Sequence, residues 1–388
     1  MKKHIVVIPD GAADTAGGGS STPLESARTP WLDRMASRGR VGRIMNTPSG
    51  FPPGSDVAIL SLLGFSPEKG YTGRGPLEAA AMGIPMGKGD FIMRMNLVGI
   101  KNGLMDDYSA GHISTRDSGR IIKLLNSRLD EPGVRFFTGL GYRHIARIKG
   151  NFSGLELTPP HDITGRKISR YLPSGPGSGR LIGIMERARK IISSCGSGGT
   201  AKTPATDVWF WGGGGRPALP SFRKVYGRKA AVITAVNLVK GIAGLCGMDV
   251  IKVPGITGYL DTDYAAKAEY ALRNIKRYDM IFIHVEAPDE AGHEGSFSKK
   301  KRAIEDIDRH IIRPLYGHVL HNPGTVCAVI PDHPTPVSRK THVRGHVPFL
   351  VFGGGENRAQ AGRFTEKYAA SSGFELESFS FINFLLGQ

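Results

Sequence analysis

Residues 4–10 read HIVVIPD, a short apolar run that stops at an acid, and this design sets the expectation for the whole fold. Two later stretches share it: DMIFIHVEAPD at 279–289 and TVCAVIPDH at 325–333. Continuous runs of Val and Ile are typical of strands in a parallel sheet that is covered on both faces. Ligands of such sheets bind beyond the carboxyl ends of the strands. The three runs therefore predict strands of one parallel sheet with a functional edge where the polar residues gather.

Further runs complete the expected sheet domain. KAAVITAV at 229–236 and VPFLVFGG at 347–354 predict two more strands. Residues 263–278 and 302–317 place apolar or small side chains at helical spacing and predict helices between the strands. Strands that alternate with helices indicate the α/β class, with a doubly wound, mainly parallel sheet.

The middle of the chain has a different pattern. It contains the short strand-like stretches FIMRMNLVGI and YRHIARIKG, with helices expected near 117–128 and 181–194. A chain of 388 residues is also longer than one small domain. We therefore expect 88–205 to form a smaller α+β domain, inserted into a sheet domain made of 1–87 and 206–388.

Cysteine content and hydropathy indicate the cytoplasm. The three cysteines, Cys195, Cys246 and Cys327, have neither metal-site spacing nor an obvious pairing, which is typical of a reducing compartment. The apolar run from Ile5 to Ile8 is too short for a signal peptide, and no later run is long enough to cross a bilayer. The expectation is a cytoplasmic protein without a membrane partner.

The formal net charge of +17 has three explanations. The simplest is a solvated basic surface, followed by the attraction of a small anionic substrate, with nucleic acid third. The densest basic run, SKKKR at 298–302, has no interleaved aromatic residues of the kind found in RNA-binding motifs. We expect a small phosphorylated substrate and no nucleic acid. The oligomeric state is not indicated.

The stretch FPPGSDVAILSLLGFSP at 51–67 places a serine where a helix begins. Pro52, Pro53 and Gly54 predict a tight turn, and the apolar run from Val57 predicts a buried helix. Ser55 would then lie at a helix N-terminus, where free N–H groups and the dipole favour an anion such as phosphate. On this stretch alone, a plain serine N-cap is the simpler interpretation.

Acids and histidines from distant parts of the chain would meet at the functional edge of the sheet. Beside Ser55, the candidates are Asp10, Asp289, His293, Asp332, His333 and His342. Each alone has an ordinary interpretation, such as a turn residue or a loop histidine. Together, carboxylates with imidazoles suit Mn, Zn, Fe or Co. Two such ions would clamp the oxygens of a phosphoryl transfer, and one would activate Ser55 as a nucleophile. We therefore favour a two-metal site.

Several motifs resemble those of one family. They are VIPDGAAD at 7–14, PPGSDVAILSLLGFSP at 52–67, YTGRGPLEAAAMGI at 71–84, PDEAGHEG at 288–295, and PDHPTP with KTHVRGHVPF between 331 and 349. In this order and spacing they look like the cofactor-independent phosphoglycerate mutases of the archaeal type, which belong to the alkaline phosphatase superfamily. The match extends from residue 4 to about residue 352. The resemblance implies an alkaline-phosphatase-like sheet domain.

The resemblance also implies roles for the candidate residues. One ion would be held by Asp289, His293 and His342. The second would be held by Asp10, Asp332 and His333. Ser55, beside the second ion, would be the nucleophile that becomes phosphorylated. The implied cofactors are two divalent ions, with Mn favoured and Zn, Co or Mg as alternatives, and no bisphosphoglycerate.

Two departures from the family pattern affect these roles. The family usually has Asp-Pro where this chain has Gly345-His346, so His346 is a rival metal ligand. We favour His342 because it keeps the family spacing before Val347. Arg216 stands where relatives more often have lysine, which keeps the charge but changes the geometry.

The implied activity is the interconversion of 3- and 2-phosphoglycerate through a phosphoserine. Substrate binding would fall to Arg74, Arg143, Arg216 and His112, with Lys240 acting from the sheet domain. His112 and Lys240 would also serve catalysis, His112 by moving protons to and from the hydroxyls. The insert would close over the substrate and exclude water.

Three alternatives remain open at this point. The same metal core supports phosphatases and a proposed homoserine-kinase-like phosphotransfer, although the chain has no G-x-x-x-x-G-K-[ST] stretch for a nucleotide. A non-enzymatic basic binding protein would be expected to lack metal ligands, and none of the implied ligands is missing.

Overall fold

The computed structural model describes residues 2–15, 21–195, 204–354 and 362–387. The chain divides into two compact units, Met1–Tyr71 with Ala218–Gln388, and Thr72–Pro217. The sequence-based boundaries, between 87 and 88 and between 205 and 206, both fall within the second unit. The first boundary falls there because helix α4 (Arg74–Ala81) packs on strands β3 and β7 of that unit, and the second because β7 pairs with β3. The domain assignment itself stays a prediction.

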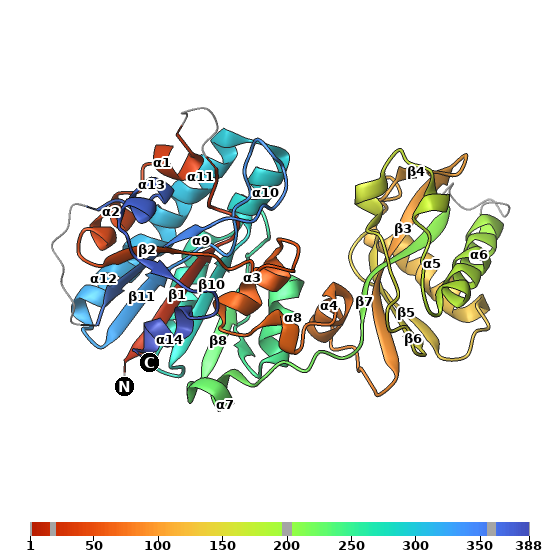
Figure 1. Cartoon of the computed structure of the whole chain (residues 1–388), viewed down its shortest axis with the longest axis horizontal. Helices are drawn as coiled ribbons and strands as arrows, with labels where there is room; N and C mark the ends of the chain where they lie inside the picture. Colours follow the sequence, from red (N-terminus) through yellow and green to blue (C-terminus); the bar gives the residue numbers. More distant parts are fainter. Residues whose placement is uncertain (1, 16–20, 196–203, 355–361, 388) are drawn as a thin grey trace. The chain divides into compact units, whose positions relative to one another are not determined.

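The first unit is built on an eight-stranded sheet (Figure 1). Its strands are β1 (Lys3–Pro9), β2 (Arg40–Ile44), β8 (Ala230–Ile233), β9 (Asp249–Val250), β10 (Met280–Val285), β11 (Thr325–Val329), β12 (Val347–Gly353) and β13 (Glu375–Leu376). Their order is β13-β2-β12-β11-β1-β10-β8-β9. β12 runs antiparallel to β11 and β2, and the other neighbours pair in parallel. The predicted α/β fold with a mainly parallel sheet is confirmed.

Both faces of this sheet are covered, as continuous apolar strands require. Ile5 and Val7 of β1 point into one hydrophobic cluster. Ile8, by contrast, lines a small apolar space on the other side together with Ile59 and Val239. These two come from α3 (Ser55–Leu62) and α8 (Asn237–Leu245). Burial on both sides explains why the strands carry no alternation of polar and apolar residues.

The other described helices of the first unit are α1 (Pro23–Ser26), α2 (Pro30–Ala36), η1 (Pro67–Lys69), α7 (Phe222–Tyr226), α9 (Tyr264–Asn274), α10 (Ala287–Glu294), α11 (Phe297–Ile307), η5 (Asp308–Ile312), α12 (Arg313–His321), α13 (Glu366–Ser371) and α14 (Phe381–Leu386). The helix predicted at 263–278 corresponds to α9. No described helix is long and apolar enough to cross a membrane.

The helix predicted at 302–317 is part of a longer helical stretch that contains one irregular turn. α11 begins earlier, because the Ser296 side chain accepts a hydrogen bond from the Lys299 N–H. η5 is a π-turn that precedes Pro314. Proline lacks the N–H of a regular helix and clashes with the preceding turn, which accounts for the widening there.

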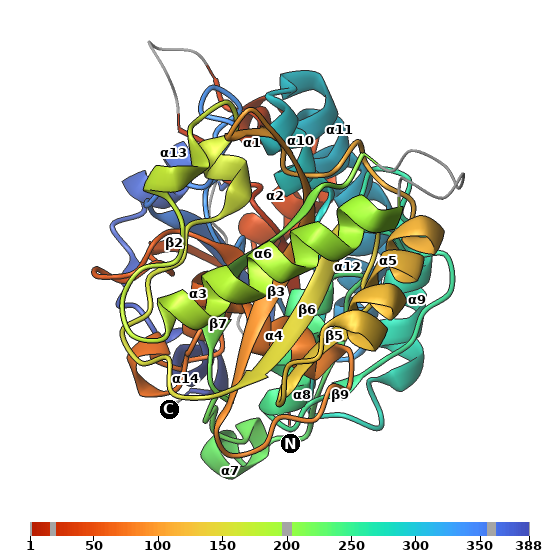
Figure 2. The same ribbon diagram turned by 90° about the vertical axis from the view of Figure 1, so that its right-hand side faces the viewer.

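The second unit is an antiparallel sheet with helices (Figure 2). Its strands are β3 (Asp90–Lys101), β4 (Leu104–Asp107), β5 (Val134–Phe137), β6 (Arg143–Lys149) and β7 (Asp207–Gly214). The long β3 pairs with β4, β6 and β7, and α5 (Thr115–Arg128) and α6 (Ser178–Cys195) lie over the sheet. The short turns η2 (Pro160–Ile163) and η3 (Ile168–Arg170) complete it. Both helices expected in the middle of the chain are present.

A buried lysine connects the loops that follow β1 and β11. Lys300 on α11 is fully buried, and its Nζ donates to the carbonyls of Ala13 (3.0 Å) and Thr335 (2.7 Å). The same Nζ lies 3.0 Å from Asp14 Oδ2. Burial lowers the pKa of Lys300, and Asp14 counteracts part of that effect. This ion pair fixes the two loops at the C-terminal edge of the sheet.

Removing that lysine should destabilise the protein strongly. Lys300→Ala leaves the Asp14 carboxylate and two carbonyls buried without their partner, so we expect a loss of about 3–5 kcal/mol in the free energy of unfolding. Lys301→Ala is the matched control, because Lys301 is partly exposed and its one ion pair, 3.8 Å from Nζ to Glu305 Oε1, is long and solvated; it should change stability by less than about 0.5 kcal/mol. Urea unfolding of both variants measures the difference, and equal effects would contradict this role.

Candidate functional site

The candidate site lies where β1, β10 and β11 end. Asp10 directly follows β1, and Asp332 lies three residues after β11. Asp289 is carried by α10, which starts two residues after β10. Because the three strands are parallel neighbours, their carboxyl ends bring these acids to one edge of the sheet.

Asp289, His293 and His342 form one group of facing side chains. His293 Nε2 lies 3.2 Å from Asp289 Oδ2, and His342 Nε2 lies 3.5 Å from Asp289 Oδ1. The two Nε2 atoms are 3.0 Å apart. Asp289 and His293 share one face of α10 because they are four residues apart. One carboxylate and two imidazoles that converge in this way can bind one divalent ion.

Asp10, Asp332 and His333 form a second group, and all three are buried. His333 Nε2 lies 3.5 Å from Asp10 Oδ1 and 3.3 Å from Asp332 Oδ2. Among the described residues, neither of these two carboxylate oxygens has a hydrogen-bond partner. Burial, and next the charge of Asp332, raise the pKa of Asp10 well above its usual range. A buried carboxylate oxygen without a partner is costly, and a cation removes that cost, so these residues fit a metal ion.

Ser55 lies next to the second group. Its Oγ is 3.1 Å from His333 Nε2, and Ser55 is the first residue of α3. The N-cap interpretation is wrong, because Gly54 occupies that position and makes no side-chain bond to the helix. The hydroxyl is therefore not used for capping and points instead at the candidate metal ligands. The apolar residues that follow, Val57 to Leu62, are buried and hold α3 against the sheet.

Thr335 and Gly11 connect the two groups. The Thr335 hydroxyl donates to Asp289 Oδ1 (2.5 Å) and lies 3.2 Å from His333 Nδ1. The Gly11 N–H donates to Asp332 Oδ1 (3.0 Å). Gly11 has φ of +59°, and a Cβ there would stand 2.4 Å from Asp289 Oδ1. Only glycine allows the chain to pass so close to the first group.

The electrostatics of the two groups differ. Burial raises the pKa of Asp289, but its hydrogen bonds with His293 and His342 outweigh this effect and hold the pKa well below its usual range. The same hydrogen bond raises the pKa of His293 to about 9. Burial lowers the pKa of His333. Without a metal, a proton therefore takes the place of a cation in the first group.

His284 and Glu286 were missed by the sequence analysis. His284 Nε2 lies 2.9 Å from Asp10 Oδ2, and its Nδ1 lies 3.2 Å from Thr234 Oγ1. Asp10, His284 and Glu286 form a third group that could hold an ion. Burial, and next the charge of Asp289, raise the pKa of Glu286 to about 8. The available signal was a histidine and a glutamate at the end of an otherwise apolar strand.

The rival ligand His346 lies apart from both groups. It is partly exposed, and its Nε2 is 2.9 Å from Glu375 Oε1. His342 stands in the first group instead, as the family spacing predicted. The geometry therefore favours His342, although its role as a ligand stays a prediction.

The candidate substrate-binding residues are spread over both units. Lys240 lies on α8 of the first unit, and burial lowers its pKa. In the second unit, His112 and Arg143 are exposed, and both border the ring of Tyr142. The centres of the His112 and Tyr142 rings are 6.3 Å apart, and the Arg143 guanidinium lies 5.4 Å from the centre of the Tyr142 ring. The structure thus brings together two of the predicted residues.

The other two predicted residues of the second unit have different surroundings. Arg74 Nε lies 3.1 Å from Glu78 Oε1 on the same helix. Arg216 is exposed and lines a glycine-rich cavity of about 620 Å³ that Lys88 also borders. Substrate contact by all five residues stays a prediction.

Comparison with known proteins identifies the family. A family model described as 2,3-bisphosphoglycerate-independent phosphoglycerate mutase matches residues 36–195. The protein of that name from Methanosarcina acetivorans is 46% identical over 359 residues, which cover 90% of each chain. This chain belongs to the 2,3-bisphosphoglycerate-independent phosphoglycerate mutase family. The resemblance drawn from the sequence motifs is confirmed.

Solved structures agree with this membership. The cofactor-independent phosphoglycerate mutase from Thermoplasma acidophilum matches with a TM-score of 0.67 and 25% identity, and the match covers 100% of this chain and 99% of that one. A protein from Pyrococcus horikoshii matches with a TM-score of 0.80 and 26% identity, over 100% and 97% of the two chains.

Metal binding should separate His342 from His346. We expect Mn²⁺ to raise the melting temperature of the wild-type protein, because it binds the folded state and neutralises buried carboxylates. His342→Ala should lose much of this increase, whereas the matched control His346→Ala should keep it. Thermal unfolding with EDTA or with Mn²⁺ measures the difference. The opposite pattern would assign the ligand to His346.

The metal affinity should rise with pH. His293 holds a proton below about pH 9 in the metal-free protein, and a metal binds only the neutral imidazole. The metal must therefore displace this proton, and the displacement becomes less favourable as the pH falls. We expect the Mn²⁺ dissociation constant to fall as pH rises from 6 to 8, by up to about tenfold per pH unit for each displaced proton. Calorimetric titrations across this range test the sign, and a pH-independent constant would contradict it.

Proposed function

We propose that this protein is an isomerase that interconverts 3-phosphoglycerate and 2-phosphoglycerate without bisphosphoglycerate. The observation that carries the proposal is the position of Ser55, whose Oγ lies 3.1 Å from His333 Nε2 in the second group of candidate metal ligands. In a chain of this family, that arrangement supports transfer of a phosphoryl group to the protein and back. The net charge of +17 suits an anionic substrate.

Two divalent ions are the proposed cofactors, with Mn²⁺ favoured and Zn²⁺, Co²⁺ or Mg²⁺ as alternatives. The first ion would be held by Asp289, His293 and His342. The second would be held by Asp10, Asp332 and His333, with Ser55 beside it. When bound, the ions lower the pKa of the serine hydroxyl and neutralise the phosphoryl oxygens. The mixed carboxylate and imidazole donors support Mn²⁺ or Zn²⁺ over Ca²⁺.

Ser55 is the proposed nucleophile. In the first step Ser55 Oγ gives up its proton and forms a bond to phosphorus while the bond from phosphorus to the substrate oxygen breaks, and the released alkoxide takes up a proton. In the second step the other glycerate hydroxyl gives up its proton and attacks the phosphoserine, and the Ser55 oxygen leaves and takes up a proton. The N-terminus of α3 supports this role, because the dipole and free N–H groups of a helix start favour a phosphate.

The glycerate must stay bound while its hydroxyls exchange places. We propose that Arg74, His112, Arg143, Arg216 and Lys240 hold its carboxylate and phosphate. His112 would also move the proton to and from the hydroxyls. Guanidinium groups pair with both anionic groups through two parallel hydrogen bonds. A closed site would keep water from the phosphoserine, which is what separates a mutase from a phosphatase.

We propose the cytoplasm as the compartment. Cys246 and Cys327 are free thiols buried in the fold, and burial raises both pKa values to about 12, which keeps the thiols unreactive.

Phosphorus NMR of the chain with 3-phosphoglycerate and Mn²⁺ tests the proposal. We expect a 2-phosphoglycerate signal that needs the metal and needs no ATP or bisphosphoglycerate. Ser55→Ala should reduce the rate by at least about 10³-fold, because it removes the nucleophile. Ser66→Ala, which changes a serine just beyond α3, should keep the activity.

Two outcomes would overturn the assignment. Release of free phosphate without 2-phosphoglycerate would identify a phosphatase on the same metal site. No reaction by the metal-loaded protein would reject the mutase, and ATP with homoserine would be the next substrate pair to test.

A further inference from the structure

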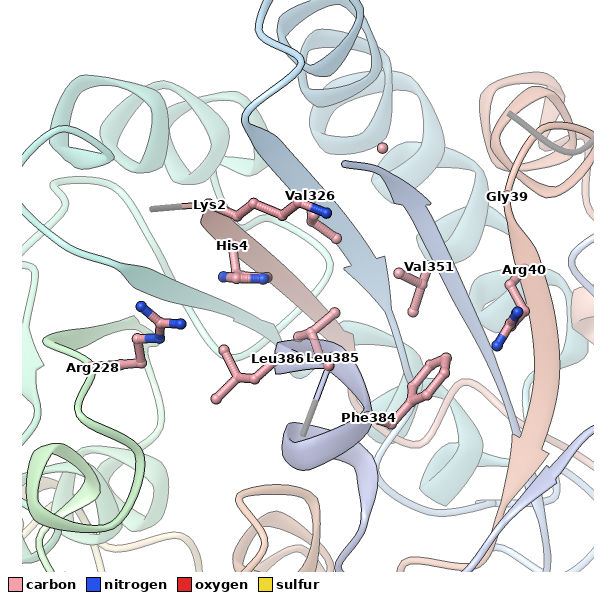
Figure 3. A pocket seen from close by; sticks show the side chains of 12 residues that line it. Lys2, His4, Gly39, Arg40, Arg228, Val326, Val351, Phe384, Leu385 and Leu386 are labelled. Carbon is pink, nitrogen blue, oxygen red and sulfur yellow. The ribbon is translucent and has the colours of Figure 1, made fainter. Parts of the chain in front are cut away.

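A second place in the first unit has the properties of a ligand site. A cavity of about 380 Å³ is lined by Lys2 and His4 at the start of β1 and by Val326 at the start of β11 (Figure 3). Asp10 follows the other end of β1. Since β1 has seven residues and a strand rises about 3.3 Å per residue, the cavity lies on the order of 20 Å from the candidate metal site.

The polar lining of the cavity is basic. Lys2, Arg40 and Arg228 border it together with His4, and none of the described residues that line it is acidic. In Figure 3, Arg228 points toward His4, with Lys2 on the other side of the imidazole. Like charges held around one space repel each other unless an anion lies between them.

The carboxylate that interacts with Arg228 is already used elsewhere. This is Asp279, whose charge is coupled to that of Arg228. One Asp279 oxygen accepts from Lys3 Nζ (3.1 Å), and the other accepts from the Lys229 N–H (2.9 Å). Asp279 therefore does not neutralise the lining of the cavity by itself.

Two buried nitrogen atoms at the cavity have no partner. His4 is only 3% exposed, and its Nδ1 has no hydrogen-bond partner within the part of the chain that the structure describes. The same is true of Arg228 Nε. Burial and the charges of Arg228 and Lys2 outweigh the backbone hydrogen bonds of His4 with Asp279 and Leu385 and lower its pKa to about 4, so the imidazole is neutral at pH 7 and carries one N–H. The unpartnered Arg228 Nε–H is costly to bury, and an anion would satisfy it.

The rest of the lining is apolar. Leu385 and Leu386 of α14 and Val351 of β12 face the cavity (Figure 3). Arg40 comes from β2 on the other side of these leucines, and its guanidinium lies 5.7 Å from the centre of the Phe384 ring. A matching ligand would have one strongly anionic group and a less polar body.

We propose that this cavity binds a small organic phosphate, with the phosphate among Lys2, His4 and Arg228 and the body against α14. A phosphate carries close to two negative charges at pH 7 and accepts several hydrogen bonds, which matches the cationic side chains of Lys2 and Arg228 and the unpartnered Arg228 Nε–H. The volume falls within the range of small-molecule sites. The site does not depend on the metal ions or on the mutase reaction.

Calorimetric titration of the full chain tests this site with three probes. Adenosine 5′-monophosphate supplies both a phosphate and a body, inorganic phosphate supplies only the charge, and adenosine supplies only the body. Without metal, we expect the monophosphate to bind, phosphate to bind more weakly, and adenosine not to bind. Binding that appears only with Mn²⁺ would belong to the metal site and would overturn the proposal.

Matched variants locate the binding. Arg228→Gln should weaken the binding of adenosine 5′-monophosphate about tenfold, which is the usual effect of losing one hydrogen bond to a charged group. Arg223→Gln is the control, because Arg223 is an exposed arginine on the nearby α7 that does not line the cavity. Lys2→Gln changes an exposed residue, and it should weaken binding in the same direction. Equal affinity in Arg228→Gln, Lys2→Gln and Arg223→Gln would contradict the proposal.

Discussion

The first unit is organised around buried negative charge. Asp10, Asp289 and Asp332 come from the ends of three neighbouring parallel strands and are all buried. Two carboxylate oxygens among them have no hydrogen-bond partner within the described residues. Carboxylates in such a place are stable only with protons or cations beside them. The histidines that converge on these acids show that cations, rather than hydrogen bonds alone, are the expected partners.

The surrounding structure keeps these acids in place. Lys300 ties the loops after β1 and β11 to α11, so that Asp10 and Asp332 approach from fixed directions. Thr335 links the two groups, and Gly11 allows the backbone to pass between them. Ser55 is the first residue of the buried helix α3, which fixes its hydroxyl beside His333. A flexible serine on a loop would not be held at one distance from His333.

Much of the fold and the site follows from local sequence patterns. Uninterrupted apolar strands that end in acids predict a covered parallel sheet, and parallel strands necessarily share a carboxyl edge. The four-residue spacing of Asp289 and His293 predicts one helical face. The choice between His342 and His346, by contrast, depends on the path of a loop, which spacing alone does not determine. His284 was missed because its role depends on which strand lies next to β1.

Other features depend on tertiary packing. Gly54, and not the expected Ser55, is the N-cap of α3. The Ser55 hydroxyl contacts His333, which comes from a distant part of the chain, so the local sequence does not reveal this contact. The π-turn before Pro314 interrupts a helix that periodicity alone would have placed in one regular piece. The sequence does not determine the first boundary of the second unit, because α4 resembles a helix of either unit. Its packing on β3 and β7 assigns α4 to the second unit.

The measurement that tests the central claim most directly is the metal stoichiometry of the folded chain. Equilibrium dialysis against Mn²⁺, followed by electron paramagnetic resonance, counts the bound ions and detects their magnetic coupling at short separation. The account predicts two coupled ions per chain in the wild type and in Ser55→Ala. It predicts one uncoupled ion in His293→Ala, where the second group stays intact. A single ion in the wild type, or two uncoupled ions, would contradict the two-metal site.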